Sequence, residues 1–308
     1  MPPALMLAAA FAALAGPSQP SPIDLSVMSY NVHGLPWPIA TGRAEALQKI
    51  GQRLEDMRQR GEQPRIVLLQ EAFTSEAKAI AQEAGYKFVV AGPERSERSS
   101  PSSALEEKVE DSGLLILSDY PVLDARQVPY SRSACAGFDC LANKGIVMVR
   151  VRVPGASQPL TVIDTHLNSR HASGAGIDRS NAAFGRQAEQ LRDFVAQNVS
   201  AASPAIVAGD FNVGKDAYRR AMIDGGNNVL PGGDDALQTA LSRNPGLSDL
   251  SATQAIVSHG KDWMFVRGGN SIGLELRGVT VPFGRERDGR SLSDHFGYVA
   301  HFLIANGN

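Results

Sequence analysis

The chain has few aromatic residues, only two cysteines and almost no net charge. Aromatics make up 6% of its 308 residues, too few for a protein that binds nucleic-acid bases on a stacking platform. Thirty lysines and arginines against 32 acidic residues give a formal net charge of −2, which argues against a protein that coats nucleic acid. No central hydrophobic run is long enough to span a bilayer. A hydrophobic content of 43% excludes disorder along the whole chain and predicts a substantial folded core.

The first residues carry an apolar stretch over residues 4–15 that ends in the small residues Ala13 and Ala15. This pattern predicts a secretory signal over residues 1–15, followed by an extended linker over residues 16–24. No lysine or arginine precedes the apolar stretch, and an alanine-rich disordered tail is the alternative. The expected location is therefore secreted or periplasmic.

The two cysteines, Cys135 and Cys140, lie close together in the segment SACAGFDCLANKG. An even number of cysteines at short spacing in an exported chain predicts one local disulfide, and two free thiols are the alternative. A zinc site is disfavoured because no pair of histidines or further cysteines stands nearby. Closing so short a loop removes little chain entropy, so the bond is expected to clip a loop rather than hold a domain.

Short apolar runs alternate with amphipathic stretches, which predicts one α/β domain over residues 25–305. The helices are expected within residues 41–59, 76–84 and 179–199. The strands are expected at residues 25–30, 66–69, 88–91, 114–117, 145–153, 160–164, 205–207, 263–266 and 296–304. A serine-rich surface loop is expected over residues 93–110 and a glycine-rich loop over residues 224–235.

Polar side chains of catalytic type stand at the ends of these apolar runs. The residues are Asn31, Glu71, His166, Asp210, Asn212, Asp262, Asp294 and His295. Taken singly, each has an ordinary explanation as a solvated residue, a cap or a turn former. Because the ends of strands in a sheet can converge on one cleft, their joint occurrence predicts a single active site.

Six short motifs occur in a fixed order along the chain: NVHGLP, LLQEAF, DTHL, GDFN, KDWMFV and SDH. Together they resemble the endonuclease/exonuclease/phosphatase (DNase I-like) superfamily of metal-dependent phosphoesterases, over about residues 26–302. The resemblance implies a four-layer α/β/β/α sandwich, with two packed, mainly antiparallel sheets and helices outside. A narrower similarity, to secreted bacterial neutral sphingomyelinases, rests on EDSGLLILSDYPV, CLANKGIVMVRV and IDTHLNS.

Glu71 is the first candidate for a Mg²⁺ ligand, because magnesium prefers hard carboxylate oxygens; Mn²⁺ or another divalent ion is an alternative. The resemblance implies that Asn31 orients Glu71 or touches the metal, and that Asp294 helps to bind it.

His295 is the candidate general base, since an imidazole titrates near working pH. The resemblance places Asp262 as the acceptor that fixes the tautomer of His295. It also implies that Asp210 and Asn212 hold the attacking water or the phosphate.

His166 is expected to donate to a phosphate oxygen. Lys144 is expected to do the same, or to order the loop that contains Asp139. Asp139 and Lys144 keep the spacing seen in neutral sphingomyelinases, although ordinary surface charges are the alternative. The remaining histidines are expected on the surface or in packing roles: His33, His171, His259 and His301.

Three substrate classes compete: a phospholipid headgroup, as for a sphingomyelinase or phospholipase C, a nucleic acid, and a smaller phosphoester. Export and the similarity to sphingomyelinases favour the lipid, and the net charge disfavours tight duplex binding. The apolar segments 35–39 and 279–283 are candidate membrane contacts, with packed loops as the alternative. Three arginines, Arg285, Arg287 and Arg290, either meet phosphates or form a solvated loop. An inactive binding module is a minor alternative, and no obligate protein partner is indicated.

Overall fold

Two six-stranded sheets pack face to face in this computed structural model, which describes residues 23–95, 109–224, 226, 228–243 and 250–307. The first sheet has the order β11-β12-β1-β2-β4-β3 and the second β5-β6-β7-β8-β10-β9. The strands of the first are β1 (Ile23–Gly34), β2 (Ile66–Ala72), β3 (Phe88–Ala91), β4 (Leu115–Ser118), β11 (Ile272–Phe283) and β12 (Gly297–Asn306). Those of the second are β5 (Val122–Pro129), β6 (Gly145–Val151), β7 (Leu160–His166), β8 (Ala205–Asp210), β9 (Asp234–Asp235) and β10 (Asp262–Arg267).

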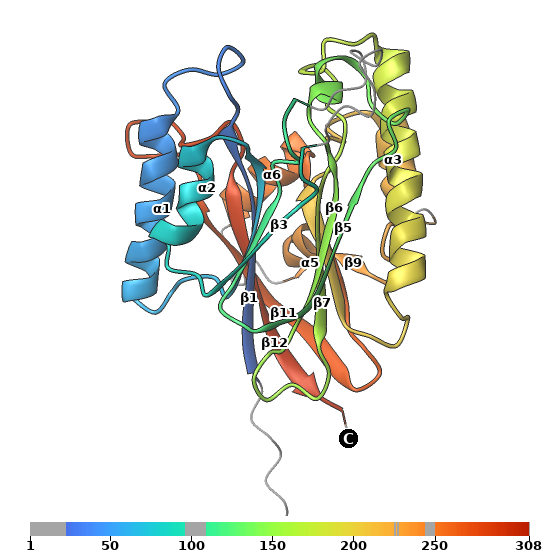
Figure 1. The fold of residues 1–308 in the computed structure, drawn as a ribbon. Coiled ribbons are helices and arrows are strands. Elements are labelled where there is room, and N and C mark those ends of the chain that lie inside the picture. The colour runs from blue at the N-terminus through green and yellow to red at the C-terminus, as the bar shows by residue number, and fades with distance from the viewer. Residues whose placement is uncertain (1–22, 96–108, 225, 227, 244–249, 308) are drawn as a thin grey trace, which may run out of the picture.

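Helices cover the outer faces of both sheets (Figure 1). They are α1 (Ala44–Gln59), α2 (Ser75–Glu83), α3 (Ile177–Asn198), α4 (Ala217–Ile223), α5 (Ala236–Ser242) and α6 (Leu250–His259), with a short 3-10 helix η1 (Gly137–Leu141). In Figure 1, α1 and α2 flank the first sheet and α3 flanks the second. None of the described helices is long and apolar enough to cross a membrane.

The hydrophobic core lies in three layers between these elements. The central layer joins the inner faces of the two sheets through residues such as Leu25, Leu68 and Val149. The outer layers place Ile50 of α1 against the first sheet and Phe184 of α3 against the second. Because both faces of the central strands are buried, these strands read as continuous apolar runs in the sequence. The four-layer α/β/β/α fold is therefore confirmed.

The pairing of the strands is antiparallel except at two places. β1 runs parallel to β2, and β7 runs parallel to β8. Parallel neighbours end at the same edge of their sheet, so the residues that follow these four strands lie at one end of the sandwich. The expectation of mainly antiparallel sheets is confirmed.

Two long strands were not predicted, β5 and β11. β5 exposes most of its side chains and is held by pairing with β6, so its sequence lacks the alternation of a half-buried strand. β11 pairs along the length of β12 and buries Val279 and Phe283. Of the two alternatives for residues 279–283, the structure favours packing on the body over a membrane contact: Phe283 stacks on Tyr30, with ring centroids 5.0 Å apart.

Several other expectations differ from the structure or lie outside it. The predicted signal over residues 1–15, part of the linker and most of the serine-rich loop (96–108) lie outside the described residues. The glycine-rich loop 224–235 contains the short strand β9, which pairs with β10. The helices α4, α5 and α6 were missed because they are short and two of them carry few buried apolar residues.

Asp235 caps α5 and provides a test of stability against pH. Its Oδ1 accepts the Leu237 amide at 2.9 Å, and burial raises the pKa of the carboxyl from 3.8 to about 7. The folded chain thus holds a proton that the unfolded chain releases at lower pH, so this group favours folding less as pH rises from 3.8 to about 7. We expect the free energy of unfolding of the wild type, measured by urea unfolding at each pH, to fall across this window relative to Asp235→Asn, by at most about 1.4 kcal/mol for each pH unit. Parallel profiles for the two proteins would contradict it.

Candidate active site

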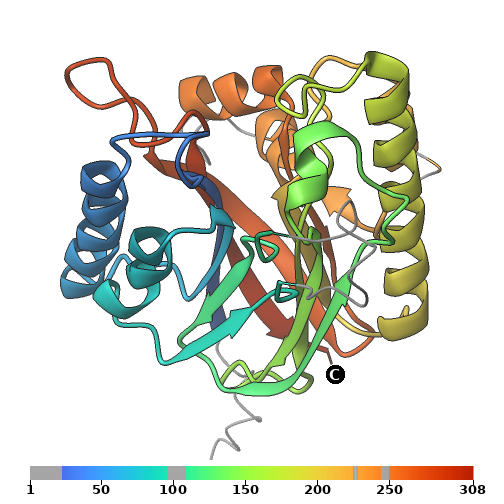
Figure 2. The same ribbon diagram turned by 45° about the horizontal axis from the view of Figure 1, so that its top comes forward.

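The strand ends bring the predicted site residues together at one end of the sandwich, which Figure 2 turns toward the viewer. In the second sheet, His166, Asp210 and Asp262 are direct cross-strand neighbours on β7, β8 and β10. Neighbours in register point to the same face of a sheet, so the three side chains form a row. Asn31 of the first sheet donates its Nδ2 to Asp210 Oδ2 at 3.0 Å and joins the two sheets at this point.

His295 lies buried beside this row, on the segment that precedes β12. Its Nδ1 lies 2.9 Å from both carboxylate oxygens of Asp262. Its Nε2 lies 3.5 Å from Asp210 Oδ2, and His166 Nε2 lies at the same distance from that oxygen. The imidazole is thus oriented by one carboxylate and turned toward another, an arrangement that can accept and hold a proton.

Three non-glycine residues have a left-handed backbone among the residues that the structure describes, and all three belong to this site. They are His33 with φ 53°, Glu71 with φ 56° and Asn212 with φ 52°. Such conformations are uncommon for these residue types and persist only where the surroundings hold them. At each position the chain turns sharply at or near the end of a strand, which directs the side chain into the cleft.

The neighbouring charges shift the pKa values of the buried groups strongly. Burial alone would lower the pKa of His295, but the carboxylates of Asp262 and Asp210 raise it to about 10. Burial and the adjacent Lys144 lower the pKa of His166 to about 3. The pKa values of the two histidines thus lie far apart: at neutral pH, without a bound cation, His295 carries a proton that Asp262 and Asp210 stabilise, and His166 is neutral.

A divalent cation fits the group formed by Glu71, His166 and Asp210. Each offers a ligand atom, and these atoms lie within 4.8 Å of one another. Glu71 Oε2 is buried and has no hydrogen-bond partner among the described residues, and burial raises the pKa of this carboxyl. An unpaired buried carboxylate is unfavourable unless a cation offsets it. The two carboxylates are the hard oxygen donors that Mg²⁺ or Mn²⁺ prefers, whereas Asn31 turns its Nδ2 toward Asp210 and its Oδ1 accepts from the His33 backbone amide.

Lys144 and Asp139 lie beside this group. The Lys144 side chain is 6% exposed, and its Nζ donates to Asp139 Oδ2 and to the Leu167 carbonyl, both at 3.1 Å. The same Nζ lies 3.1 Å from His166 Nε2. An ordinary surface charge, the alternative weighed for Lys144, does not fit this burial.

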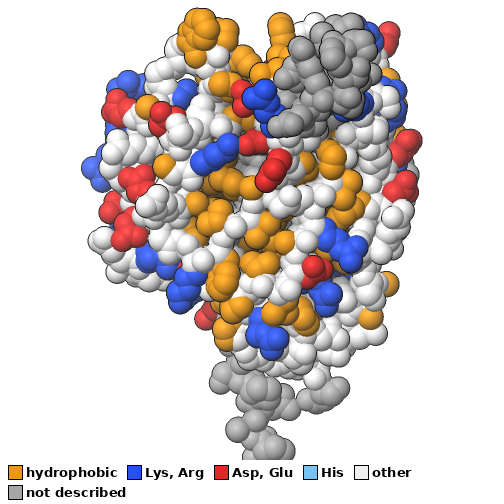
Figure 3. All heavy atoms as spheres, in the orientation of Figure 1, with side chains coloured by type: hydrophobic (Ala, Val, Ile, Leu, Met, Phe, Trp, Pro, Cys, Tyr) orange, Lys and Arg blue, Asp and Glu red, His pale blue; other side chains and the backbone are white. Residues whose placement is uncertain are grey.

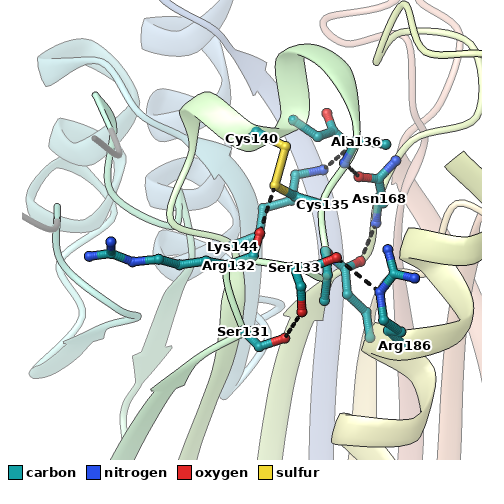
Figure 4. The surroundings of a disulfide bond; sticks show 12 residues. Ser131, Arg132, Ser133, Cys135, Ala136, Cys140, Lys144, Asn168 and Arg186 are labelled. Atoms are coloured by element: carbon teal, nitrogen blue, oxygen red, sulfur yellow. Dashed lines mark hydrogen bonds and ion pairs between the residues drawn. A yellow bond between two sulfur atoms is a disulfide. The ribbon is translucent and has the colours of Figure 1, made fainter. Parts of the chain in front are cut away.

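The predicted disulfide is present between Cys135 and Cys140 (Figure 4). It encloses the start of η1 and lies next to the loop that follows β7, where Ala136 N donates to Asn168 Oδ1 at 2.9 Å. The bond therefore shapes the segment that carries Asp139 toward the site.

Removal of this bond is expected to have little effect on global stability. The two cysteines are separated by only 5 positions. The loss of chain entropy in the unfolded state stabilises a protein by about 3 kcal/mol when a disulfide closes a 15-residue loop, and by less for a shorter loop. We expect the paired substitution of both cysteines by alanine to change the thermal midpoint only slightly. A large fall in the melting temperature would show that the bond holds more than a loop.

Asp294 lies outside the group that fits a cation. Its Oδ1 is 2.6 Å from His33 Nδ1, and its side chain is 56% exposed. Although burial opposes the shift, the hydrogen bond from His33 lowers the pKa of Asp294. His33 was expected on the surface or in packing; it instead faces the catalytic cavity and pairs with Asp294. A metal-binding role for Asp294 stays a prediction.

Further residues at the site were missed. Lys261 Nζ lies 3.5 Å from His295 Nε2, and the His259 ring lies 5.6 Å from the His295 ring, centroid to centroid. Lys261 directly precedes Asp262 in KDWMFV, so its position was the available signal. Arg219 and Arg43 hold the loops of the site from beneath. Nothing in the sequence around either residue distinguishes it from an arginine on the surface.

Arg43 ties two segments of the site together. Its guanidinium donates to the carbonyls of Val32 and His33 at the end of β1, and to the Leu292 carbonyl near His295. Arg43 occupies the N-cap position of α1, which starts at Ala44, but its side chain makes no capping hydrogen bond to the helix.

Comparison with known proteins agrees with this architecture. A model of the Endonuclease/Exonuclease/phosphatase family matches residues 28–295, and the chain belongs to this family of phosphoester hydrolases.

Among individual proteins, the chain is 26% identical over 302 residues to a sphingomyelinase of Mycobacterium tuberculosis, which covers 92% of this chain. The chain spans 54% to 61% of the length of the curated relatives it matches. Among solved structures, sphingomyelinase C of Streptomyces griseocarneus has a TM-score of 0.63 at 21% identity, covering 93% of this chain and 100% of that one. A Staphylococcus aureus beta toxin variant with bound magnesium ions has a TM-score of 0.64 at 20% identity with the same coverage. At these identities the structures establish the fold.

Proposed function

We propose that the chain is a Mg²⁺-dependent phosphodiesterase that cleaves a phospholipid in the manner of a sphingomyelinase or phospholipase C. The observation that carries this proposal is that His295, held by Asp262, lines the same cavity as the group of Glu71, His166 and Asp210. Hydrolysis of a phosphodiester needs a base for the water and positive charge around the phosphate, and this cavity contains candidates for both.

His295 takes the proton of the attacking water at Nε2, while Asp262 holds Nδ1 and stabilises the imidazolium that forms. Asp210 and Asn212 orient the water or the scissile phosphate. Asn212 is positioned for this by its Nδ2, which donates to the Leu167 carbonyl at 3.0 Å, and by its amide, which donates to Asp210 Oδ1 at 2.9 Å.

Glu71 and Asp210 would hold the cation, with Asn31 orienting Asp210 through its Nδ2. A bound divalent cation would offset the charge of the phosphate and, by neutralising Asp210, would lower the pKa of His295. Lys144 and His166 donate to the phosphate oxygens in the transition state, and the ion pair with Asp139 keeps Lys144 in place.

An apolar mouth supports a lipid as the substrate. Leu35 and Ile39 of the loop after β1 and Phe138 and Leu141 of η1 line the same cavity as the catalytic residues. Phe138 is 66% exposed, and Trp37 at the tip of the loop is 80% exposed. Hydrophobic side chains of this loop stand at the upper left edge of the molecule in Figure 3. Exposed aromatic and apolar side chains beside an active site suit contact with a bilayer.

The test compares two substrates with one purified sample. We expect Mg²⁺-dependent release of phosphocholine from sphingomyelin vesicles and no comparable nicking of plasmid DNA. Chelation with EDTA should stop the reaction, and added Mg²⁺ should restore it. Without the cation, the negative charges of Glu71 and Asp210 are not offset. Plasmid nicking at a higher rate would favour a nuclease. Inactivity on both substrates and on soluble phosphodiesters would favour a binding module.

The proposal includes export, for which the disulfide is the supporting observation, since such bonds persist in oxidising compartments. Mass spectrometry of the mature N-terminus tests the predicted cleavage near Gly16. An intact Met1 on the exported protein would contradict it.

A further inference from the structure

A second cavity, of about 820 Å³, adjoins the catalytic cavity. Residues that line both are Ser169, Ala172, Asn212, Lys261 and Asp294. Its remaining walls come from the loops after β7 and β8, the end of α6 and the segment before β12, which surround the end of the sandwich seen in Figure 2. The two cavities thus form one continuous cleft, and the His295–Asp262 pair lies where they meet, since His295 lines the catalytic cavity and Asp262 the second one.

The lining of this second cavity is strongly cationic. Its cations are Arg170, Lys215, Lys261 and Arg285. Among the described residues, no carboxylate forms an ion pair with Lys215, Lys261 or Arg285; Arg170 pairs with Asp216 at 3.3 Å. The chain as a whole has a net charge of −2, so this gathering of positive charge is local.

The other titratable groups of the cavity offset this charge only in part, since Lys261 interacts with Asp294 and Asp210 while Lys215 and Arg285 form no ion pair among the described residues. Its two acidic residues already have partners, because Asp262 pairs with His295 and Asp294 pairs with His33. Burial and Lys261 lower the pKa of His259, which leaves it a neutral donor or acceptor. His171 adds a further nitrogen at the wall. Like charges that converge on a cavity repel one another, and an anionic ligand relieves that repulsion.

The two halves of the cleft differ in chemistry. The apolar residues Leu35, Ile39, Phe138 and Leu141 line only the catalytic cavity, whereas Lys215 and Arg285 line only the second one. A quaternary ammonium group is bound by aromatic faces and acidic residues, and the second cavity offers Phe296 as its single aromatic side chain among four cations. Its charge is therefore opposite to that needed for choline.

Resting on the proposed phospholipase activity, we infer that the second cavity binds an anionic headgroup that carries a phosphate monoester in addition to the scissile diester. Lys215 and Arg285 contact the monoester, while the lipid alcohol leaves on the side of the apolar mouth. In this hydrolysis the water oxygen forms a bond to phosphorus and the bond from phosphorus to the lipid alcohol breaks. One proton passes from the water through His295 to the alcohol, and the headgroup leaves as a bisphosphate.

The test uses vesicles that contain phosphatidylinositol 4-phosphate, phosphatidylinositol or sphingomyelin, adjusted to equal surface charge with phosphatidylserine. We expect kcat/KM to be about tenfold or more higher for the phosphorylated headgroup. The double variant Lys215→Gln/Arg285→Gln should remove that preference and leave hydrolysis of bis(p-nitrophenyl) phosphate unchanged. Arg287→Gln is the matched control, because it removes one charge from the same segment but lies outside this cavity.

Binding separates failure of this inference from failure of the proposed activity. Cosedimentation of the His295→Ala protein with the same vesicles should show the headgroup preference without turnover, and the double variant should lose it. Selective binding by an inactive wild type would refute the proposed function and support the cationic headgroup site. Turnover or binding without preference, or equal loss with Arg287→Gln, would refute the site. A preference for a single-stranded oligonucleotide that the double variant abolishes would overturn the lipid assignment.

Discussion

Replacement of His295 by alanine is expected to lower kcat by about a thousandfold or more while the fold stays intact. The imidazole is the group whose Nδ1 is held by both oxygens of Asp262 and whose Nε2 faces Asp210. It touches polar groups and lies on a loop segment, so its removal leaves the hydrophobic layers undisturbed. Steady-state kinetics with excess Mg²⁺, together with circular dichroism and the melting temperature, provide the measurement.

Two further variants sharpen this test. Asp262→Asn keeps the size of the side chain, but its amide nitrogen can donate a hydrogen bond to His295 where the carboxylate accepts one. We expect kcat to fall by about a hundredfold or more. His301→Ala is the control: His301 lies on β12 and contacts Thr280 away from the cleft, so its loss should leave kcat near the wild-type value. Retention of more than a tenth of the rate by His295→Ala would show that another group is the base.

The second large effect is expected from Arg219, which is fully buried beneath the site. Its Nη1 donates to the carbonyls of Asn168 and Asn212, both at 2.8 Å, and its Nε donates to Asn181 Oδ1 at 2.8 Å. The guanidinium also lies 4.7 Å above the Phe184 ring centroid. Arg219 therefore joins the two loops that carry the site to the helix α3 behind them.

Arg219→Met keeps the length of the side chain but leaves these oxygens without donors in the interior. Loss of one partner from a buried charged network costs about 3–5 kcal/mol, so we expect a large fall in the free energy of unfolding. We also expect a lower kcat at temperatures below the melting transition, where the variant is still folded, because Asn212 loses its anchor. Urea unfolding and kinetics measure the two effects. Arg277→Met, an exposed arginine paired with Glu275, should change stability by about 0.5 kcal/mol or less. Equal stability of the two variants would contradict this role for Arg219.

The residues of the candidate active site could be predicted from the sequence because they follow apolar strands. Glu71, His166 and Asp210 each come at or near the end of a buried run, and parallel pairing of β1 with β2 and of β7 with β8 brings such ends together. The disulfide was also predictable, since two cysteines at short spacing have one simple partner each. In both cases the relevant contact follows from local pattern and a common strand direction.

Other features depended on partners distant in the chain. β11 owes its length to pairing with β12, and the burial of Phe283 follows from Tyr30 on a strand about 250 positions earlier. His33 has no distinguishing pattern around it, yet its left-handed backbone and Asp294 place it at the cavity. Arg219 resembles its neighbour Arg220 in sequence, and only the packing of α4 against the two loops separates a buried anchor from a partly exposed arginine.

By itself, the order of residues determined the class of fold and the strands that end in the candidate site residues, because hydrophobic periodicity and residue type are local properties. The tertiary structure alone decided that Lys144 is buried beside His166, that the segment 279–283 belongs to an edge strand which buries Val279 and Phe283, and that four cations line one cavity next to an apolar mouth. These arrangements depend on which surfaces of distant segments face each other, and burial and electrostatic interaction act through space rather than along the chain.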